Sequence, residues 1–136
     1  MAGVENLDPG NETHRFGDHV TADVPDGVTV QAGDAVQIHS DTTDSGIPVV
    51  EPVDGGAVFG VVAVTPPYQS EVTVTTSGTV VANVVEGVTA GSPLGAPDTS
   101  SGGANEPAGT LSATGSGRGT SVLDTNSNGV AEVYLF

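Results

Sequence analysis

β-branched residues and chain breakers alternate along this sequence. Its 136 residues include 23 valines and 16 threonines, whose side chains branch at Cβ and favour a pleated strand over a helix. A further 20 glycines and 9 prolines interrupt the chain every few residues. No stretch repeats apolar residues at helical spacing for more than about two turns. The sequence therefore predicts one all-β domain, folded as a small β-barrel or a compact β-sandwich.

The expected strands are runs of β-forming residues between turn residues. Residues 58–64 are almost all apolar, which predicts a strand buried on both faces. Residues 71–76 alternate with period two and predict a strand with one buried face. The remaining expected strands lie at residues 28–30, 35–39, 47–51, 79–84, 110–113, 120–123 and 131–136.

Two segments differ from this pattern. Residues 1–19 show no periodicity and are expected to form an extended N-terminal arm, which leaves a single β domain over residues 20–136. Residues 97–108 are rich in Gly, Ser, Asn and Pro and are expected to form a mobile loop. Residues 27–34 and 87–92 share an Ala-Gly corner whose glycine is expected to have positive φ. Duplication and independent use of the same turn chemistry both remain open for this pair.

The charge of the chain is unusual, because it contains no lysine. Arg15 and Arg118 are its only permanent cations, against 17 Asp and Glu residues spread from Glu5 to Glu132, for a net charge of -15. Such a coat is expected of a protein that works in molar salt, where a Debye length of about 3 Å screens the self-repulsion. The composition predicts an extreme halophile or one of its viruses as the source. An ordinary acidic mesophilic domain is the alternative.

The same composition argues against several functions. Two distant arginines form no basic patch for nucleic acid or for an anionic membrane surface. No apolar run approaches the roughly 20 residues of a transmembrane helix, and residues 1–6 show no secretory signal, so we expect synthesis in a cytoplasm. The chain has no cysteine for disulfides or thiolate metal sites, and no lysine for a biotinyl or lipoyl carrier.

One segment matches the start of a calcium loop. Asp124, Asn126 and Asn128 place oxygens at positions 1, 3 and 5, and Gly129 stands at position 6. The bidentate glutamate expected at position 12 is missing, since Leu135 stands there. Asn128-Gly129 is also a strong signal for a type I′ hairpin turn. A weak cation site and an ordinary hairpin turn are therefore alternatives, and the turn is favoured.

The sequence gives little support for a histidine metal site or for a catalytic site. His14, His19 and His39 have no spacing that presents them together, so solvated or interface histidines are favoured over a metal site. No Gly-x-Ser-x-Gly motif occurs, and the acids fall mostly in turns, where they are usually structural. The sequence predicts a protein that is not an enzyme and needs no cofactor.

Short motifs follow one another in a consistent order along residues 20–136. They lie at residues 31–36, 59–63, 72–78, 88–94, 117–120 and 129–135. In order and composition they resemble the small β-rich capsid decoration (cement) proteins of tailed viruses. Residues 1–19 and 97–108 and the lack of lysine are not explained by this resemblance.

The resemblance implies a virion protein on the outer capsid surface. It implies a homotrimer that binds the major capsid protein and braces neighbouring capsomers without chemistry. The arm is expected to gain order on docking, which lets a short segment wrap a partner's surface. Its expected capsid contacts are Glu5, Asn6, Leu7, His14, Arg15 and Phe16. The alternatives are a turret, fibre or tail protein of the same kind of virus, or a cell-surface or carbohydrate-binding β module of a halophile.

Overall fold

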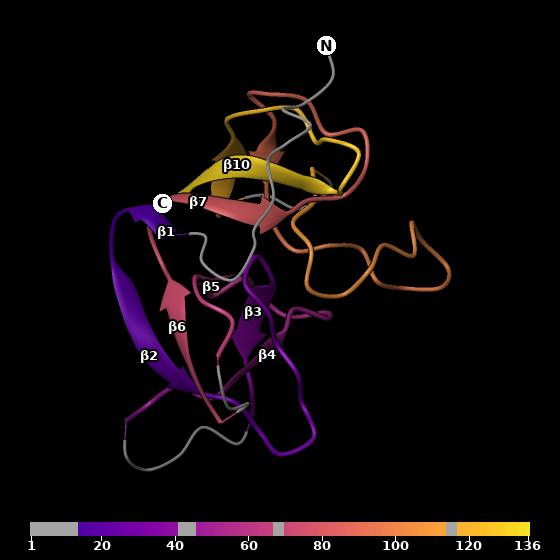
Figure 1. Ribbon diagram of the computed structural model, residues 1–136. Helices are drawn as coiled ribbons and strands as arrows, with labels where there is room; N and C mark the ends of the chain where they lie inside the picture. Colours follow the sequence, from indigo (N-terminus) through magenta and orange to yellow (C-terminus); the bar gives the residue numbers. More distant parts are fainter. Residues whose placement is uncertain (1–13, 41–45, 67–69, 114–116) are drawn as a thin grey trace.

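The chain folds into two packed β-sheets (Figure 1). This computed structural model describes residues 14–40, 46–66, 70–113 and 117–136, with the backbone alone at residues 14–16. Within these ranges it has ten strands and no helix, so the expected all-β fold is confirmed.

Each sheet has five strands, and neighbouring strands run antiparallel. The first sheet has the order β1-β7-β10-β9-β8 and consists of β1 (His14–Phe16), β7 (Gly78–Asn83), β8 (Pro93–Leu94), β9 (Gly119–Ser121) and β10 (Val130–Leu135). The second sheet has the order β2-β6-β5-β3-β4 and consists of β2 (His19–Asp23), β3 (Ala35–Ile38), β4 (Val50–Pro52), β5 (Gly60–Val62) and β6 (Glu71–Thr75).

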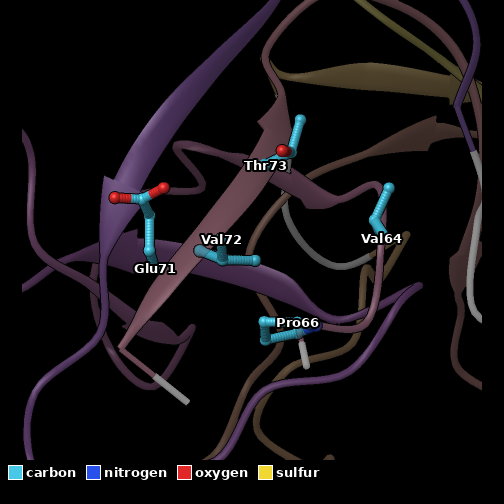
Figure 2. A pocket seen from close by; sticks show the side chains of 5 residues that line it. All are labelled: Val64, Pro66, Glu71, Val72 and Thr73. Atoms are coloured by element: carbon cyan, nitrogen blue, oxygen red, sulfur yellow. The ribbon is translucent and has the colours of Figure 1, made fainter. Parts of the chain in front are cut away.

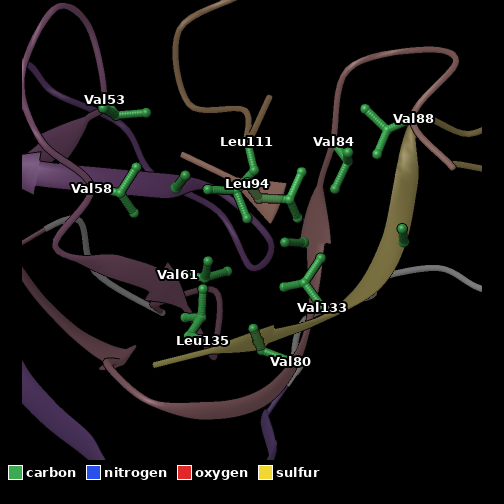
Figure 3. Close-up of a cluster of buried hydrophobic side chains, with 13 residues drawn as sticks. Val53, Val58, Val61, Val80, Val84, Val88, Leu94, Leu111, Val133 and Leu135 are labelled. Atoms are coloured by element: carbon green, nitrogen blue, oxygen red, sulfur yellow. The ribbon is translucent and has the colours of Figure 1, made fainter. Parts of the chain in front are cut away.

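The main core lies between the two sheets (Figure 3). Alternate residues of β10, such as Val133 and Leu135, point into it, as the period-two geometry of a strand requires. The opposite sheet contributes Val61, β8 of the first sheet adds Leu94, and Leu111 comes from a segment outside the strands. All of these side chains are fully buried.

A second core cluster forms on the other face of the second sheet. It consists of Ala22, Val24, Val30, Val36, Val50, Val62, Val72 and Val74. Consecutive residues of one strand therefore serve different clusters, since Val61 packs in the main core and Val62 in the second cluster. The strand expected to be buried on both faces is thus confirmed at β5.

The arrangement is a sandwich rather than a closed barrel. Among the described residues, strand pairing closes neither sheet, and β1, β8, β2 and β4 remain as edges. One isolated parallel bridge between Asp23 and Val49 brings the edges of the second sheet together. There the Asp23 N–H donates to the carbonyl of Pro48 at 2.8 Å.

A polar joint connects the start of β3 to the end of β7. The side-chain amide of Asn83 donates to Asp34 Oδ1 at 2.8 Å, and the main-chain N–H of Asn83 donates to the Gly33 carbonyl at 2.8 Å. Burial raises the pKa of the Asp34 carboxyl, and its hydrogen bonds from Gln31 and Asn83 oppose that rise. Gly33 has φ 96° and Gly91 has φ 88°, so the expected positive φ at both Ala-Gly corners is confirmed.

The boundary of the expected N-terminal arm differs from the structure. His14–Phe16 pairs with β7, and β2 begins at His19, so residues 14–19 belong to the β domain. The turn between these strands is held by Asp18, whose N–H donates to the Ser77 carbonyl at 3.1 Å. The rest of the expected arm, residues 1–13, lies outside the described residues.

Three further differences concern strands. Residues 28–30 form no strand, because they lie between two turns that are closed by hydrogen bonds from Val28 N–H to Pro25 and from Asp34 N–H to Gln31. Residues 110–113 contribute only isolated bridges instead of a strand. The strand expected at residues 47–51 is present, but it is shorter and lies at Val50–Pro52.

The expected loop at residues 97–108 has no strand and is organised by Asp98. Its carboxylate accepts hydrogen bonds from the N–H of Ala104 at 3.0 Å and from the hydroxyl of Ser100 at 2.7 Å. These bonds hold the pKa of Asp98 below its usual value, and the bond from Ala104 has the largest effect. Glu106 Oε1 accepts the Asp98 N–H at 2.8 Å and so joins the two ends of the loop. The mobility of this loop stays a prediction.

Gly60 is the position at which the close approach of β5 and β6 is most easily tested. A Cβ at this residue would lie 2.6 Å from Val74 Cγ1 and would also clash with the main-chain oxygen of Thr75. Gly60→Ala should therefore lower the free energy of unfolding by about 1–3 kcal/mol, the usual cost of overpacking. Urea denaturation in concentrated NaCl measures this change. Gly102→Ala is the control, because a Cβ added there would have no atom within 4 Å apart from its own residue and its two chain neighbours. Equal effects of the two substitutions would contradict the packing.

Candidate functional site

The residues of the predicted cation site lie in a hydrogen-bonded loop between β9 and β10. Asn126 Oδ1 accepts the N–H of Asn128 at 2.9 Å and that of Val130 at 3.2 Å. Asp124 Oδ1 accepts the Ala90 N–H at 2.7 Å. A cation at this place would have to compete with these main-chain donors. In the part of the chain that the structure describes, no group of three or more His, Asp or Glu residues could hold a metal ion.

The hairpin expected at this loop is present, but not with a type I′ turn. Asn126 N–H donates to the Val130 carbonyl at 3.0 Å, and Gly129 N–H donates to the Asn126 carbonyl at 3.1 Å. Gly129 has φ 76°, whereas Asn128 does not have the positive φ that a type I′ turn requires of both central residues. This combination is typical of a three-residue loop whose glycine forms a bulge.

The three histidines lie in separate strands or loops. His14 begins β1 in the first sheet, whereas His19 begins β2 in the second. His39 follows β3, and its Nε2 lies 3.6 Å from Glu51 Oε2 on the neighbouring β4, a contact that is an ion pair when the imidazole is protonated. The contact between His39 and Glu51 joins the segment after β3 to β4, the edge strand of the second sheet.

The predicted capsid contacts fall into two groups. Glu5, Asn6 and Leu7 lie outside the described residues. His14, Arg15 and Phe16 make up β1, which pairs with β7 and forms an edge of the first sheet. Edge strands present unpaired main-chain groups and are common places for another chain to bind. The second group is therefore an edge of the sheet rather than part of a free arm.

The hollows found on the surface are open and shallow. One, of about 180 Å³, lies between β6 and the segment that follows β5 and is lined by Val64, Pro66, Glu71, Val72 and Thr73 (Figure 2). A second, of about 550 Å³, is lined in part by Asp23, Asp26 and Glu71. Asp23 and Glu71 are direct partners in the register of β2 and β6, where like charges destabilise a sheet. These hollows offer no converging acid, base and nucleophile.

The most distinctive surface lies on the outer face of the first sheet. Since Val133 and Leu135 point into the core, Tyr134 between them points outward. The pairing of β10 with β7 and β9 places Thr79 and Thr120 beside Tyr134 on this face. We call the following set of outward residues the aromatic patch: Thr79, Thr120, Val122, Glu132, Tyr134 and Phe136.

The aromatic patch contains three of the six large hydrophobic side chains that the described residues expose, including the two most exposed. Tyr134 is 50% exposed, Phe136 61% and Val122 45%. The rings of Tyr134 and Phe136 lie 6.4 Å apart between centroids, tilted by 38°, which is a favourable distance for an aromatic pair. Exposed apolar side chains that are contiguous and rimmed by polar residues mark interaction surfaces. The sequence had indicated only a terminal apolar strand here, although the alternation of core and exposed residues at positions 133–136 carries the signal.

Arg118 holds the end of this surface in place. Its guanidinium donates to the main-chain oxygens of Val58 at 3.2 Å and Phe59 at 2.8 Å, and also to those of Thr76 and Phe136. Four main-chain oxygens from segments that flank β5, β6 and β10 therefore meet one side chain, and burial lowers the pKa of Arg118. Through the bond to Phe136, the arginine fixes the strand end that carries the aromatic pair.

The first sheet presents a face with two exposed aromatic rings, whereas Asp34, Asp98 and Asp124 accept main-chain N–H groups in turns and loops. No helix within the described ranges is long and apolar enough to cross a membrane.

No protein-family model matches this chain, and no curated protein is similar to it in sequence.

The role of Arg118 can be tested by replacing its guanidinium group. Arg118→Met should lower the free energy of unfolding by about 2 kcal/mol, because hydrogen bonds to a charged group contribute about 1.5–3 kcal/mol each and this site is partly exposed to water. Hydrogen exchange at the end of β10 should become faster. Arg118→Lys should recover only part of the loss, since one ammonium cannot reproduce the planar fork. Wild-type stability in the methionine variant would show that the carbonyl contacts contribute nothing.

Proposed function

We propose that this chain is a non-enzymatic structural protein of a virion, namely a capsid decoration (cement) protein. It binds the outer capsid surface and stabilises neighbouring capsomers in concentrated salt. Its partners are the major capsid protein and further copies of itself, assembled as a trimer. The order of short sequence motifs along residues 20–136 supports this proposal by resemblance.

The observation that carries the physical part of the proposal is the aromatic patch on an acidic body. A catalytic protein needs converging groups in a protected pocket. A protein that braces a shell needs instead a stiff body and a surface that excludes water on contact. Two packed sheets supply the first, and the exposed pair Tyr134 and Phe136 supplies the second.

Salt has a defined part in this function. The chain carries a net charge of -15, and a capsid from the same high-salt setting is expected to be acidic too. Two acidic surfaces approach each other only where the charge between them is screened. High salt therefore permits docking, and apolar contact then holds the complex.

Binding to particles tests the proposal directly. We expect the purified protein to bind capsids that lack it and to raise their resistance to heat, with density on the outer face in electron cryomicroscopy. A chain lacking residues 2–13 keeps β1 and β2 and should still fold but bind more weakly, because these residues are proposed to anchor on the capsid. Truncated protein that binds equally tightly would remove the arm from the proposal, and no binding by the full chain would overturn the function.

The dependence of folding on salt is a separate prediction. The melting temperature should fall substantially between about 3 M and 0.1 M NaCl, because the Debye length grows to about 10 Å and the acids then repel one another. Glu71→Gln should lessen the fall by removing the charge opposite Asp23. Sucrose at low salt is the control, since it favours compact states without screening charge. An unchanged melting temperature would refute adaptation to high salt.

A further inference from the structure

The loop between β9 and β10 contains an asparagine that is followed directly by glycine. Asn128 is exposed, and Gly129 follows it with φ 76°. Of the six asparagines in the sequence, Asn128 is the only one that precedes a glycine. Because glycine has no Cβ, its main-chain nitrogen can approach the side chain of the preceding residue more closely than the nitrogen of any other residue can.

This pair of residues can react without a catalyst. The main-chain nitrogen of Gly129 attacks Cγ of Asn128, and the proton of that nitrogen passes to water or hydroxide. The new N–Cγ bond closes a five-membered succinimide ring as the Cγ–Nδ2 bond breaks, and Nδ2 leaves as ammonia. Water then opens the ring at either of its two carbonyls, so residue 128 becomes aspartate or isoaspartate. No oxidant, reductant or further reactant takes part.

In the folded chain, Asn126 holds the main chain on both sides of this reaction centre. The N–H of Gly129, which belongs to the attacking nitrogen, donates to the Asn126 carbonyl at 3.1 Å. Asn126 Oδ1 accepts the N–H of Asn128 at 2.9 Å and that of Val130 at 3.2 Å. Asn126 is itself buried, with 6% of its surface exposed. The nitrogen of Gly129 can therefore lose its proton and turn toward Cγ only when these hydrogen bonds open.

We propose that Asn128 is a site of spontaneous deamidation, which the hydrogen bonds to Asn126 keep closed in the folded chain and which unfolding opens. The loop hydrogen bonds are lost with the fold, so any condition that destabilises the fold accelerates the reaction. The extent of conversion at residue 128 then records how long a chain has been unfolded. This inference is independent of the proposed function.

The reaction changes a loop that leads into the centre of the first sheet. Both products add one negative charge to the -15 of the chain, in a loop that already contains Asp124. Isoaspartate also adds a methylene group to the main chain, which the hydrogen bonds of a three-residue loop do not accommodate. The loop enters β10 at Val130, and β10 pairs with both β7 and β9. Deamidated chains are therefore expected to unfold more readily than intact ones.

Mass spectrometry of the wild type before and after incubation at about pH 8 tests the proposal. Cleavage by trypsin after Arg118 releases residues 119–136, in which Asn126 and Asn128 are the only side-chain amides. In concentrated urea, Asn128 should convert at least about tenfold faster than in about 3 M NaCl, because several hydrogen bonds hold the folded loop. Asn105 is the internal control, since it is exposed but precedes Glu106. Equal rates for Asn128 in the two solutions, or conversion of Asn105 in urea as fast as that of Asn128, would overturn the inference.

Substitutions at two positions separate the hydrogen bonds from the chemistry. Asn126→Asp keeps an oxygen that can accept both N–H groups and should keep Asn128 protected in about 3 M NaCl, whereas Asn126→Ala should accelerate its conversion several-fold, with circular dichroism confirming that each variant is folded. Equal rates in these two variants would overturn the role of Asn126. Gly129→Ala in urea should slow conversion by about tenfold or more, since a methyl group crowds the attacking nitrogen. An unchanged rate in that variant would overturn the succinimide route.

Discussion

The structure depends on packing small side chains on both faces of one layer. The largest fully buried side chains are leucines and valines, and no aromatic ring is fully buried in the described part of the chain. Such residues fill only a thin space, so a thick single core would leave cavities. The second sheet is therefore covered on both faces, and Val61 and Val62 serve a separate cluster each. Gly60 follows from the same constraint, because β5 and β6 approach too closely for a Cβ.

Much of the fold could be predicted, because the information was local. A continuous apolar run, residues 58–64, indicated a strand covered on both faces, and the alternation at residues 71–76 indicated β6. Membership of a sheet could not be predicted, since a period of two shows which residues share a face and not which strand lies beside them. β2 was missed for this reason: its short mixed sequence becomes a strand only through its pairing with β6. The strand expected at residues 28–30 is absent, because this short segment lies between two turns, one closed by the bond from Val28 N–H to Pro25 and the other by the bond from Asp34 N–H to Gln31.

The candidate sites show the same limit. The loop from Asp124 to Gly129 has the oxygens of a cation site, yet the same oxygens satisfy main-chain donors in a turn, and sequence does not separate these uses. The residues of the aromatic patch are brought together only by the register of three strands, which the sequence does not show. Arg118 was visible as a rare cation, but its four carbonyl partners are distant in the sequence.

The use of Arg118 also affects how this protein meets other molecules. One of only two permanent cations in the chain is occupied by main-chain oxygens, which leaves a long-range field of one sign around most of the body. Such a field gives an approaching acidic molecule no preferred orientation, so productive encounters rely on random rotational search. Association rates are then expected near the unsteered range of about 10⁵–10⁶ M⁻¹s⁻¹ or below, and added salt should accelerate them. Most charged complexes respond in the opposite sense, because salt weakens the attraction that guides them together.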